Sequence, residues 1–270
     1  MSAPATAVSP AESSGADRGS RRTASLKKWQ SLTGVVPLGI FLLEHLWTNA
    51  KALQGAEAFN GAVADLQAIP LLPVLELFGI FLPLAFHSLY GIYLAIRGRQ
   101  DSLQHTYAND SLYLLQRVSG VLAFAFILYH LATIWLQKLL YGLSPDAFYQ
   151  TLEAQLSSTH WGVPWAALFY VIGLAATVFH FANGVPPFCI AWRLTVTTNA
   201  QRRVAIASWV LGGFLFCLGT DTVIFFATGS RFFPASWTRS PHAATMPCPA
   251  TSGALLAPAP PAPPAPPAPP

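Results

Sequence analysis

Apolar residues dominate five long stretches of the chain, and short polar segments separate them. The stretches cover residues 29–50, 70–96, 112–137, 164–192 and 204–228. A helix needs about 20 mostly apolar residues to cross the hydrocarbon core of a bilayer, and every stretch reaches that length. The pattern therefore predicts an all-α membrane protein with five transmembrane helices.

The composition supports lipid as the solvent of this chain. Hydrophobic residues make up 53% of the 270 residues and charged residues 10%, against about 25% charged in a soluble domain. We expect one transmembrane domain over residues 27–230. A basic arm, 1–26, and a Pro/Ala-rich tail, 231–270, should be disordered, the tail being a solvated polyproline II segment or an SH3-type ligand.

The three cysteines, Cys189, Cys217 and Cys248, have no paired spacing. A disulfide framework or a zinc site is therefore not expected, and the lack of a CxxCH motif argues against covalently attached haem.

Basic residues near the helix ends predict the orientation in the membrane. Eleven Lys or Arg residues lie on the side of the N-terminal arm and the 97–111 and 193–203 loops, and four lie on the opposite side. Positively charged loops stay in the cytoplasm. We expect a multi-pass protein of the bacterial cytoplasmic membrane, with the N-terminus in the cytoplasm and the C-terminus outside.

Four of the seven histidines fall inside the predicted helices, one in each of the first four. They are His45, His87, His130 and His180. The other three, His105, His160 and His242, fall in loops or in the tail, where a solvated imidazole needs no special explanation. An ionisable residue within a membrane span is a candidate functional residue.

At about 1.5 Å per helical residue, the four histidines lie at two depths. His45 and His130 share an outer level, and His87 and His180 share an inner one. Two imidazoles facing each other in an apolar bundle are what a bis-histidine haem requires. A hydrogen bond to a neighbouring helix or a proton relay would also justify a buried histidine, but neither needs such pairing.

Glycines at short spacings from the four histidines could give a flat porphyrin room. Four precede a histidine and two follow one: Gly34, Gly79, Gly120, Gly173, Gly91 and Gly184. Glycine is also common at close crossings of membrane helices, so this observation is corroborating only.

Four sequence blocks give the chain a resemblance to a known family. They are "WQSLTGVVPLGIFLLEH", "LELFGIFLPLAFHSLYGIYLAI", "LQRVSGVLAFAFILYH" and "FYVIGLAATVFHFANG". With these blocks, residues 27 to 228 resemble the dihaem cytochrome b (b558-type) membrane-anchor subunit of succinate dehydrogenases. The resemblance implies four haem-binding helices plus a fifth helix.

The resemblance also implies the cofactors and partners. Two haem b groups would be held by His45 with His130 (outer haem) and by His87 with His180 (inner haem). The subunit would anchor a flavoprotein subunit and an iron–sulfur subunit. Electrons from succinate would then pass through the inner and outer haems to a membrane quinone.

In related dihaem anchors a Gln-Ser pair contacts a propionate of the inner haem, which maps onto Gln30 and Ser31. Arg117 is a further candidate partner for a propionate, because a guanidinium binds carboxylates well. An ordinary polar helix start would explain Gln30 and Ser31 equally well, and cytoplasmic flanking charge would explain Arg117.

Three acids lie within the predicted spans, all in the outer half: Glu44, Glu76 and Asp221. Quinone reduction consumes two protons, so we expect the quinone site near the outer haem, with Glu76 as the leading proton donor and Glu44 or Asp221 assisting. Asp221 could instead be a wet helix end, and Glu44 could pair with Lys51. If the quinone is a low-potential menaquinone, the membrane potential would assist its reduction, by about 2.3 kcal/mol per charge per 100 mV.

Some fumarate-reducing relatives carry an acid beside the fourth-helix histidine, whereas the neighbours of His180 here are apolar, which favours succinate oxidation. No segment suggests a dicarboxylate site or nucleic-acid binding, so this subunit would not be an autonomous enzyme. A haem b anchor of another respiratory dehydrogenase and a cofactor-free, proton-coupled transporter are the alternatives. The transporter should show internal repeats, and none is evident.

Overall fold

The computed structural model describes residues 10–97 and 110–232, with side chains over 21–97 and 111–232. His105, His242, Cys248 and the proline-rich tail lie outside the described residues. Five helices of the described part are long and apolar enough to cross a membrane, spanning 21–54, 72–97, 111–141, 165–191 and 198–228. The expected all-α fold with five transmembrane helices is confirmed.

Several of the spanning helices consist of more than one segment. The elements in chain order are α1 (Pro10–Val35), α2 (Pro37–Asn49), η1 (Ala50–Gln54), α3 (Ala56–Gln67), α4 (Leu72–Leu75), η2 (Glu76–Phe81), α5 (Leu82–Arg97), α6 (Asp110–His130), η4 (Leu131–Trp135), α7 (Leu136–Tyr141), η5 (Pro145–Ala147), α8 (Phe148–Ser157), α9 (Trp165–Ala191) and α10 (Thr198–Thr228). The first helix is interrupted only at Val36, because Pro37 cannot donate a backbone hydrogen bond.

The N-terminal segment differs from the expected disordered arm, since helix α1 already begins at Pro10. Starting a helix is costly, whereas extending an existing one is cheap. The spanning part of the first helix therefore lets the polar residues before Lys27 continue the same helix.

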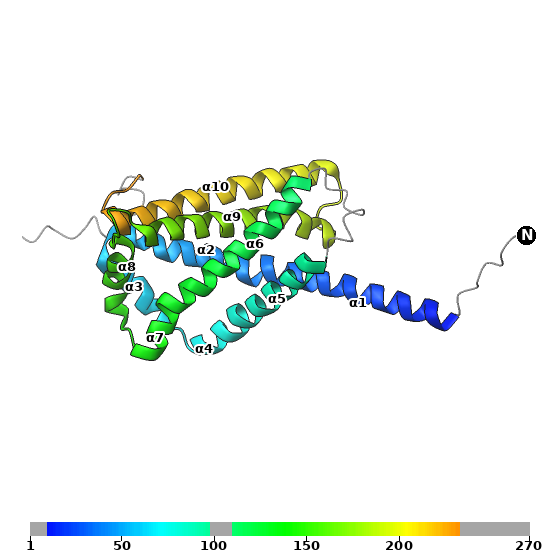
Figure 1. Ribbon diagram of the computed structural model, residues 1–270, viewed down its shortest axis with the longest axis horizontal. Coiled ribbons are helices and arrows are strands. Elements are labelled where there is room, and N and C mark those ends of the chain that lie inside the picture. The colour runs from blue at the N-terminus through cyan, green and yellow to red at the C-terminus, as the bar shows by residue number, and fades with distance from the viewer. Residues whose placement is uncertain (1–9, 98–109, 233–270) are drawn as a thin grey trace, which may run out of the picture. The chain divides into compact units, whose positions relative to one another are not determined.

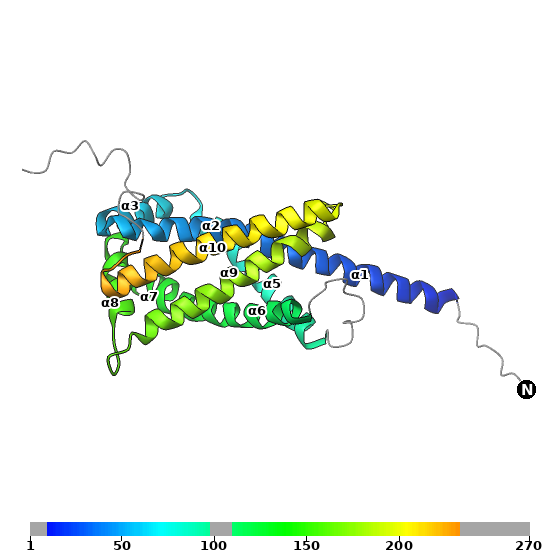
Figure 2. The same cartoon turned by 90° about the horizontal axis from the view of Figure 1, so that it is seen from above.

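Helices α9 and α10 run side by side in both views of the bundle (Figures 1 and 2). Small residues permit this close approach, which is typical of membrane helices. A Cβ atom built on Gly212 would lie 2.8 Å from the Cβ atom of Ala182. The buried Ser208 hydroxyl donates a 2.6 Å hydrogen bond to the carbonyl oxygen of Ala182.

The outward surface of the bundle is apolar, as a lipid-facing surface must be. Ile40, Ile96 and Val210 expose 63%, 75% and 68% of their surface. In water such exposure would be costly, but a bilayer covers these side chains.

Two short helices, α3 and α8, pack at one end of the bundle (Figure 1), which we name the α3/α8 end. The apolar face of α8 consists of Phe148, Leu152 and Leu156, at four-residue spacing, which places them on one side of a helix. They pack in one core cluster with Phe59 of α3 and Phe226 of α10. Both segments fall between the apolar stretches, where loops were expected.

Two of the spanning helices contain a π-helical turn, η2 in the second and η4 in the third. The rings of Phe81 in η2 and Trp135 in η4 meet at 4.9 Å between centres. π-Helical turns inside α-helices occur frequently at functional sites. Here η4 begins directly after His130, one of the four intramembrane histidines.

Candidate haem-binding site

A large, mainly apolar cavity of about 1370 Å³ lies between the helices. This volume exceeds the roughly 300–1,000 Å³ of a pocket for one drug-sized ligand. All four intramembrane histidines line the cavity: His45, His87, His130 and His180. They come from α2, α5, α6 and α9, so four different helices contribute one imidazole each.

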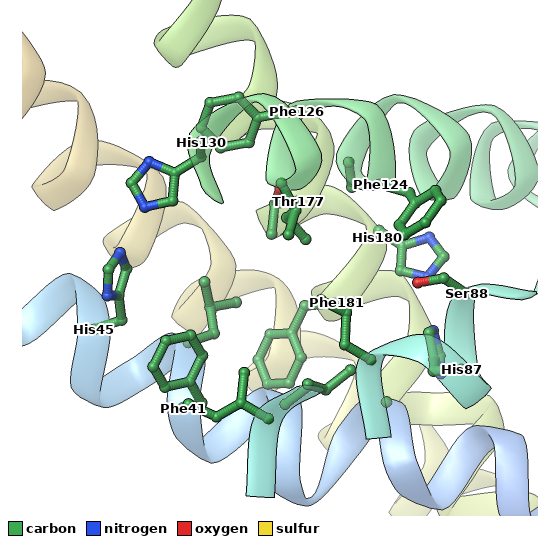
Figure 3. Close-up of a pocket in the computed structure, with 18 of the residues that line it drawn as sticks. Phe41, His45, His87, Ser88, Phe124, Phe126, His130, Thr177, His180 and Phe181 are labelled. Carbon is green, nitrogen blue, oxygen red and sulfur yellow. The ribbon is translucent and has the colours of Figure 1, made fainter. Parts of the chain in front are cut away.

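The four histidines form two pairs in space (Figure 3). The ring centres of His45 and His130 are 5.6 Å apart, and those of His87 and His180 are 5.9 Å apart. Figure 3 shows Thr177 and Phe181 between the two pairs. The structure thus brings together the residues that the depth argument had paired.

Backbone carbonyl groups orient both histidines of the second pair. Nδ1 of His87 lies 2.8 Å from the carbonyl oxygen of Gln30 in α1. Nδ1 of His180 lies 3.0 Å from the carbonyl oxygen of Gln116 in α6. A carbonyl oxygen can only accept, so each Nδ1 carries the proton and each Nε2 keeps its lone pair for a metal.

Each of these histidines lies against a glycine of a neighbouring helix. A Cβ atom on Gly34 would overlap the ring of His87, and one on Gly120 would lie 2.7 Å from Cε1 of His180. Along the chain, Gly34 lies eleven residues before His45 and Gly120 ten residues before His130. Ten or eleven residues correspond to about 15 Å along a helix. Gly34 and Gly120 therefore lie at the depth of His87 and His180 rather than at that of His45 and His130.

The surroundings of His87 and of His180 repeat the same short sequence pattern. In each case one helix supplies a glutamine and, four residues later, a glycine: Gln30 with Gly34, and Gln116 with Gly120. The partner helix supplies a histidine and, four residues later, a glycine: His87 with Gly91, and His180 with Gly184. A Cβ atom on Gly91 would lie 3.3 Å from Nε2 of Gln30, and one on Gly184 would lie 3.4 Å from Nε2 of Gln116. The four-residue spacing of glutamine and glycine is visible in the sequence and could have indicated these contacts.

Aromatic side chains enclose the other pair, at the end nearer to α8. The ring of Phe41 lies 5.2 Å from that of His45, and the ring of Phe126 stacks on His130 at 6.0 Å. The hydroxyl oxygen of Tyr170 lies 3.2 Å from Nδ1 of His130. Tyr170 was not among the residues expected to contribute to the site, because it looks like any aromatic residue of an apolar helix.

Two other glycines near the histidines in sequence have different surroundings. A Cβ atom on Gly173 would overlap the ring of Phe126, the side chain that stacks on His130. At Gly79 a Cβ atom would meet nothing within 4 Å. Gly173 therefore makes room for a neighbour of the histidine, and Gly79 makes no room for a side chain.

Polar and basic groups line the cavity at the end opposite to α3 and α8. Gln30 and Ser31 contribute to the wall together with Lys27, Lys28, Arg97 and Arg117. The Ser31 hydroxyl donates to the carbonyl oxygen of Lys28 at 2.8 Å, and the guanidinium of Arg117 donates to the hydroxyl of Tyr113. Such a concentration of cationic groups beside a cavity favours bound carboxylates.

The cavity wall also carries acids near the His45/His130 pair. Among the described residues the wall includes Glu44 and Glu76 but not Asp221. Glu76 lies 4.0 Å from Nζ of Lys138, and Glu44 accepts a 2.6 Å hydrogen bond from the hydroxyl of Thr48. Asp221 is fully buried and accepts a 2.5 Å hydrogen bond from the backbone N–H of Phe232, so it is not a wet helix end.

The separation of the imidazole rings in the two histidine pairs suits a metal ion held between two imidazoles. Imidazole nitrogens bind first-row metals at about 2.0–2.1 Å, which puts two rings on opposite sides of one ion about 6 Å apart. Among the described residues no three His, Cys, Asp or Glu side chains converge as ligands for one ion. A haem needs only two protein ligands, because the porphyrin supplies the rest.

The fold and the site thus define a multi-pass helical membrane protein whose interior histidine pairs suit b-type haems. Residues 102–220 match the family described as succinate dehydrogenase/fumarate reductase transmembrane subunit. The chain is also 37% identical over 176 residues to the succinate dehydrogenase cytochrome b558 subunit of Bacillus subtilis, covering 65% of this chain and 83% of that protein. No solved structure gives a significant match.

This chain therefore belongs to the family of cytochrome b membrane anchors of succinate dehydrogenase. Membership implies haem b, a multi-pass position in a bacterial membrane and assembly with other succinate dehydrogenase subunits.

Proposed function

We propose that this chain carries two haem b groups, one between His45 and His130 and one between His87 and His180, and passes electrons from succinate oxidation to a membrane quinone. The observation that carries the proposal is the pair of ring-centre distances, 5.6 and 5.9 Å, on four different helices. Both distances suit one metal ion held between two imidazoles.

The protein's own part would be to hold and orient the four histidines. When bound, the two haems would supply one-electron carriers at two depths of the bundle. The carbonyl oxygens of Gln30 and Gln116 fix the protonated nitrogen of His87 and His180, and a fixed tautomer sets ligand orientation and basicity. The apolar cavity wall excludes water from the histidines.

The polar end of the cavity is suited to haem propionates. Gln30, Ser31 and Arg117 line it beside Lys28, and we assign them to the propionates of the inner haem. Lys28 and Arg117 supply positive charge, and the Gln30 side chain supplies amide N–H groups. Because propionates are carboxylates, this end should be the one nearer to water.

We assign the basic end of the bundle to the cytoplasm, with the N-terminus inside and the C-terminus outside. Lys27, Lys28, Arg97 and Arg117 lie at this end of the cavity, in agreement with the charge rule for membrane proteins. The flavoprotein and iron–sulfur subunits would dock on this side and hold the dicarboxylate site. The inner haem would then be the first to receive an electron.

The quinone, menaquinone in our proposal, would bind near the outer haem. Glu76 lines the cavity beside Lys138, whose ammonium group lies 4.0 Å from the carboxylate. Glu76 would deliver protons to the reduced quinone, and Glu44, beside His45 in sequence, would assist. We assign no such role to Asp221, because the cavity wall among the described residues does not include it.

A haem count tests the proposal directly. Purified membranes that contain the complex should give a reduced-minus-oxidised b-type spectrum and two haems per chain by pyridine haemochrome assay. Replacing any one of the four histidines, for example His180→Ala, should remove at least one haem. The control is His160→Ala, an exposed histidine outside the cavity; a chain that binds no haem would refute the proposal.

A further inference from the structure

The nearest hydrogen-bond partner of His130 differs in kind from those of His87 and His180. His87 and His180 face backbone carbonyl groups at 2.8 and 3.0 Å, which no side-chain substitution removes directly, and the Ser119 hydroxyl lies farther from Nδ1 of His180, at 3.5 Å. His130 faces a side chain, the hydroxyl of Tyr170, at 3.2 Å from Nδ1. Removing one hydroxyl oxygen, that of Tyr170, therefore tests what orients the imidazole of His130.

The position of Tyr170 is fixed from several sides. Its side chain is 7% exposed and belongs to the core cluster at the α3/α8 end. Its ring meets that of His130 edge-on at 5.7 Å and that of Phe126 at 5.3 Å. A side chain packed in this way holds its hydroxyl in one place.

Polar side chains of two other elements lie near the hydroxyl of Tyr170. They are Thr133 in η4 and Gln155 in α8. Gln155 in turn lies 3.5 Å from the hydroxyl of Tyr129. A short polar chain thus runs from His130 to the helix α8, through an otherwise apolar part of the bundle.

Iron binding through Nε2 fixes the direction of the hydrogen bond. Nδ1 of His130 would then carry the proton and donate it to the Tyr170 oxygen. An imidazole that donates such a bond is a more basic ligand. A more basic ligand favours ferric iron and lowers the reduction potential of its haem.

We propose that Tyr170 is a positioning residue of the outer haem: its hydroxyl holds His130 with Nε2 towards His45 and lowers the reduction potential of that haem alone. This inference rests on the proposed bis-histidine haem sites. At the inner haem, backbone carbonyl groups would orient His87 and His180, whereas at the outer haem one hydroxyl group would orient His130.

The test compares Tyr170→Phe with Tyr149→Phe in the assembled complex. Both variants remove one phenolic hydroxyl and keep the ring, but Tyr149 of α8 lies outside the cavity wall. The readouts are the haem count, a potentiometric titration of each haem band and the low-temperature EPR signal of each ferric haem. In Tyr170→Phe the outer haem should shift to a more positive potential and change its EPR signal, with the inner haem unmoved, whereas Tyr149→Phe should leave both haems unchanged.

Unchanged potentials in Tyr170→Phe, or equal shifts of both haems, would overturn the inference. If Tyr170→Phe loses haem altogether, Gln155→Leu is the second test. It leaves Tyr170 in place but removes a polar side chain of α8 that lies near its hydroxyl. A smaller shift confined to the outer haem would support the inference, and unmoved potentials would refute it. A wild-type protein without two haems would instead refute the proposed function.

Discussion

The carbonyl oxygen of Gln30 and Nδ1 of His87 are 2.8 Å apart, although the two residues belong to different membrane helices. Gln116 and His180 repeat this relationship at 3.0 Å. In each case the glycine four residues after the glutamine makes room for the imidazole. The same local arrangement, used twice, therefore presents His87 and His180 to each other.

Gly34→Ala and Gly120→Ala should disturb the inner pair selectively. The added methyl group would overlap the ring of His87 in one variant and lie 2.7 Å from Cε1 of His180 in the other. Overpacking of this kind typically costs about 1–3 kcal/mol and shifts side chains. We expect loss or broadening of the inner-haem absorption band in both variants, with the outer-haem band retained.

The matched control for this pair is Gly213→Ala in α10, where an added Cβ atom meets nothing within 4 Å. Its haem spectrum should equal that of the wild type. An intact inner-haem band in both Gly34→Ala and Gly120→Ala would show that the glycines do not shape the haem site.

Glu76→Gln should slow quinone reduction while leaving both haem spectra intact. The substitution keeps the shape of the side chain but removes the proton that the carboxyl group can transfer, and such groups contribute roughly 10²–10⁴-fold to a rate. The measurement is succinate-driven reduction of a menaquinone analogue, followed beside succinate-driven reduction of the haems. Only the quinone step should fall.

Glu57→Gln in α3 is the control, because Glu57 is exposed and lies outside the cavity wall. Equal quinone turnover in the two variants would remove Glu76 from the mechanism. Lys138→Met should resemble Glu76→Gln if the ammonium group at 4.0 Å keeps the carboxyl group in place.

The fold was largely predictable because a bilayer imposes a simple rule on sequence. Backbone groups must be satisfied within each helix, so spans appear as long apolar runs, and five were found where five were expected. The spatial pairs of histidines were predictable for a related reason. Helical rise converts sequence position into depth, and depth alone distinguished His45 and His130 from His87 and His180.

What the sequence did not reveal depends on contacts between helices. The partners of His87 and His180 are backbone carbonyl groups, which every residue has, so no residue type marks them. The proposed role of Tyr170 depends on its hydroxyl group, but in the sequence it looks like any other aromatic residue of a membrane helix. Helix α8 was missed although Phe148, Leu152 and Leu156 have helical spacing, because a short amphipathic helix gives no membrane signal.

The proposed orientation can be measured by thiol labelling from one side of the membrane. Ser25→Cys lies at the basic end and Ser158→Cys after helix α8, and both serines are exposed. In right-side-out vesicles, with the native cysteines replaced by serine, an impermeant maleimide should label only the Ser158→Cys variant. Inverted vesicles should give the opposite pattern, and labelling of Ser25→Cys from outside would reverse the proposed topology.

Asp221 should matter for stability rather than for quinone chemistry. Its carboxylate is fully buried and accepts the backbone N–H of Phe232, just after α10 ends at Thr228. A typical hydrogen bond contributes about 0.5–1.5 kcal/mol to the stability of a protein. Asp221→Ala should therefore lower the temperature at which half of the haem absorbance is lost.

The control for this substitution is Asp65→Ala, which removes an exposed carboxylate on α3. It should leave the temperature of haem loss unchanged. Quinone reduction per haem, measured well below that temperature, should be the same in Asp221→Ala as in the wild type. A residue that only stabilises the fold changes quinone reduction only by changing stability. A fall in quinone reduction without a change in the temperature of haem loss would therefore return Asp221 to the proton path.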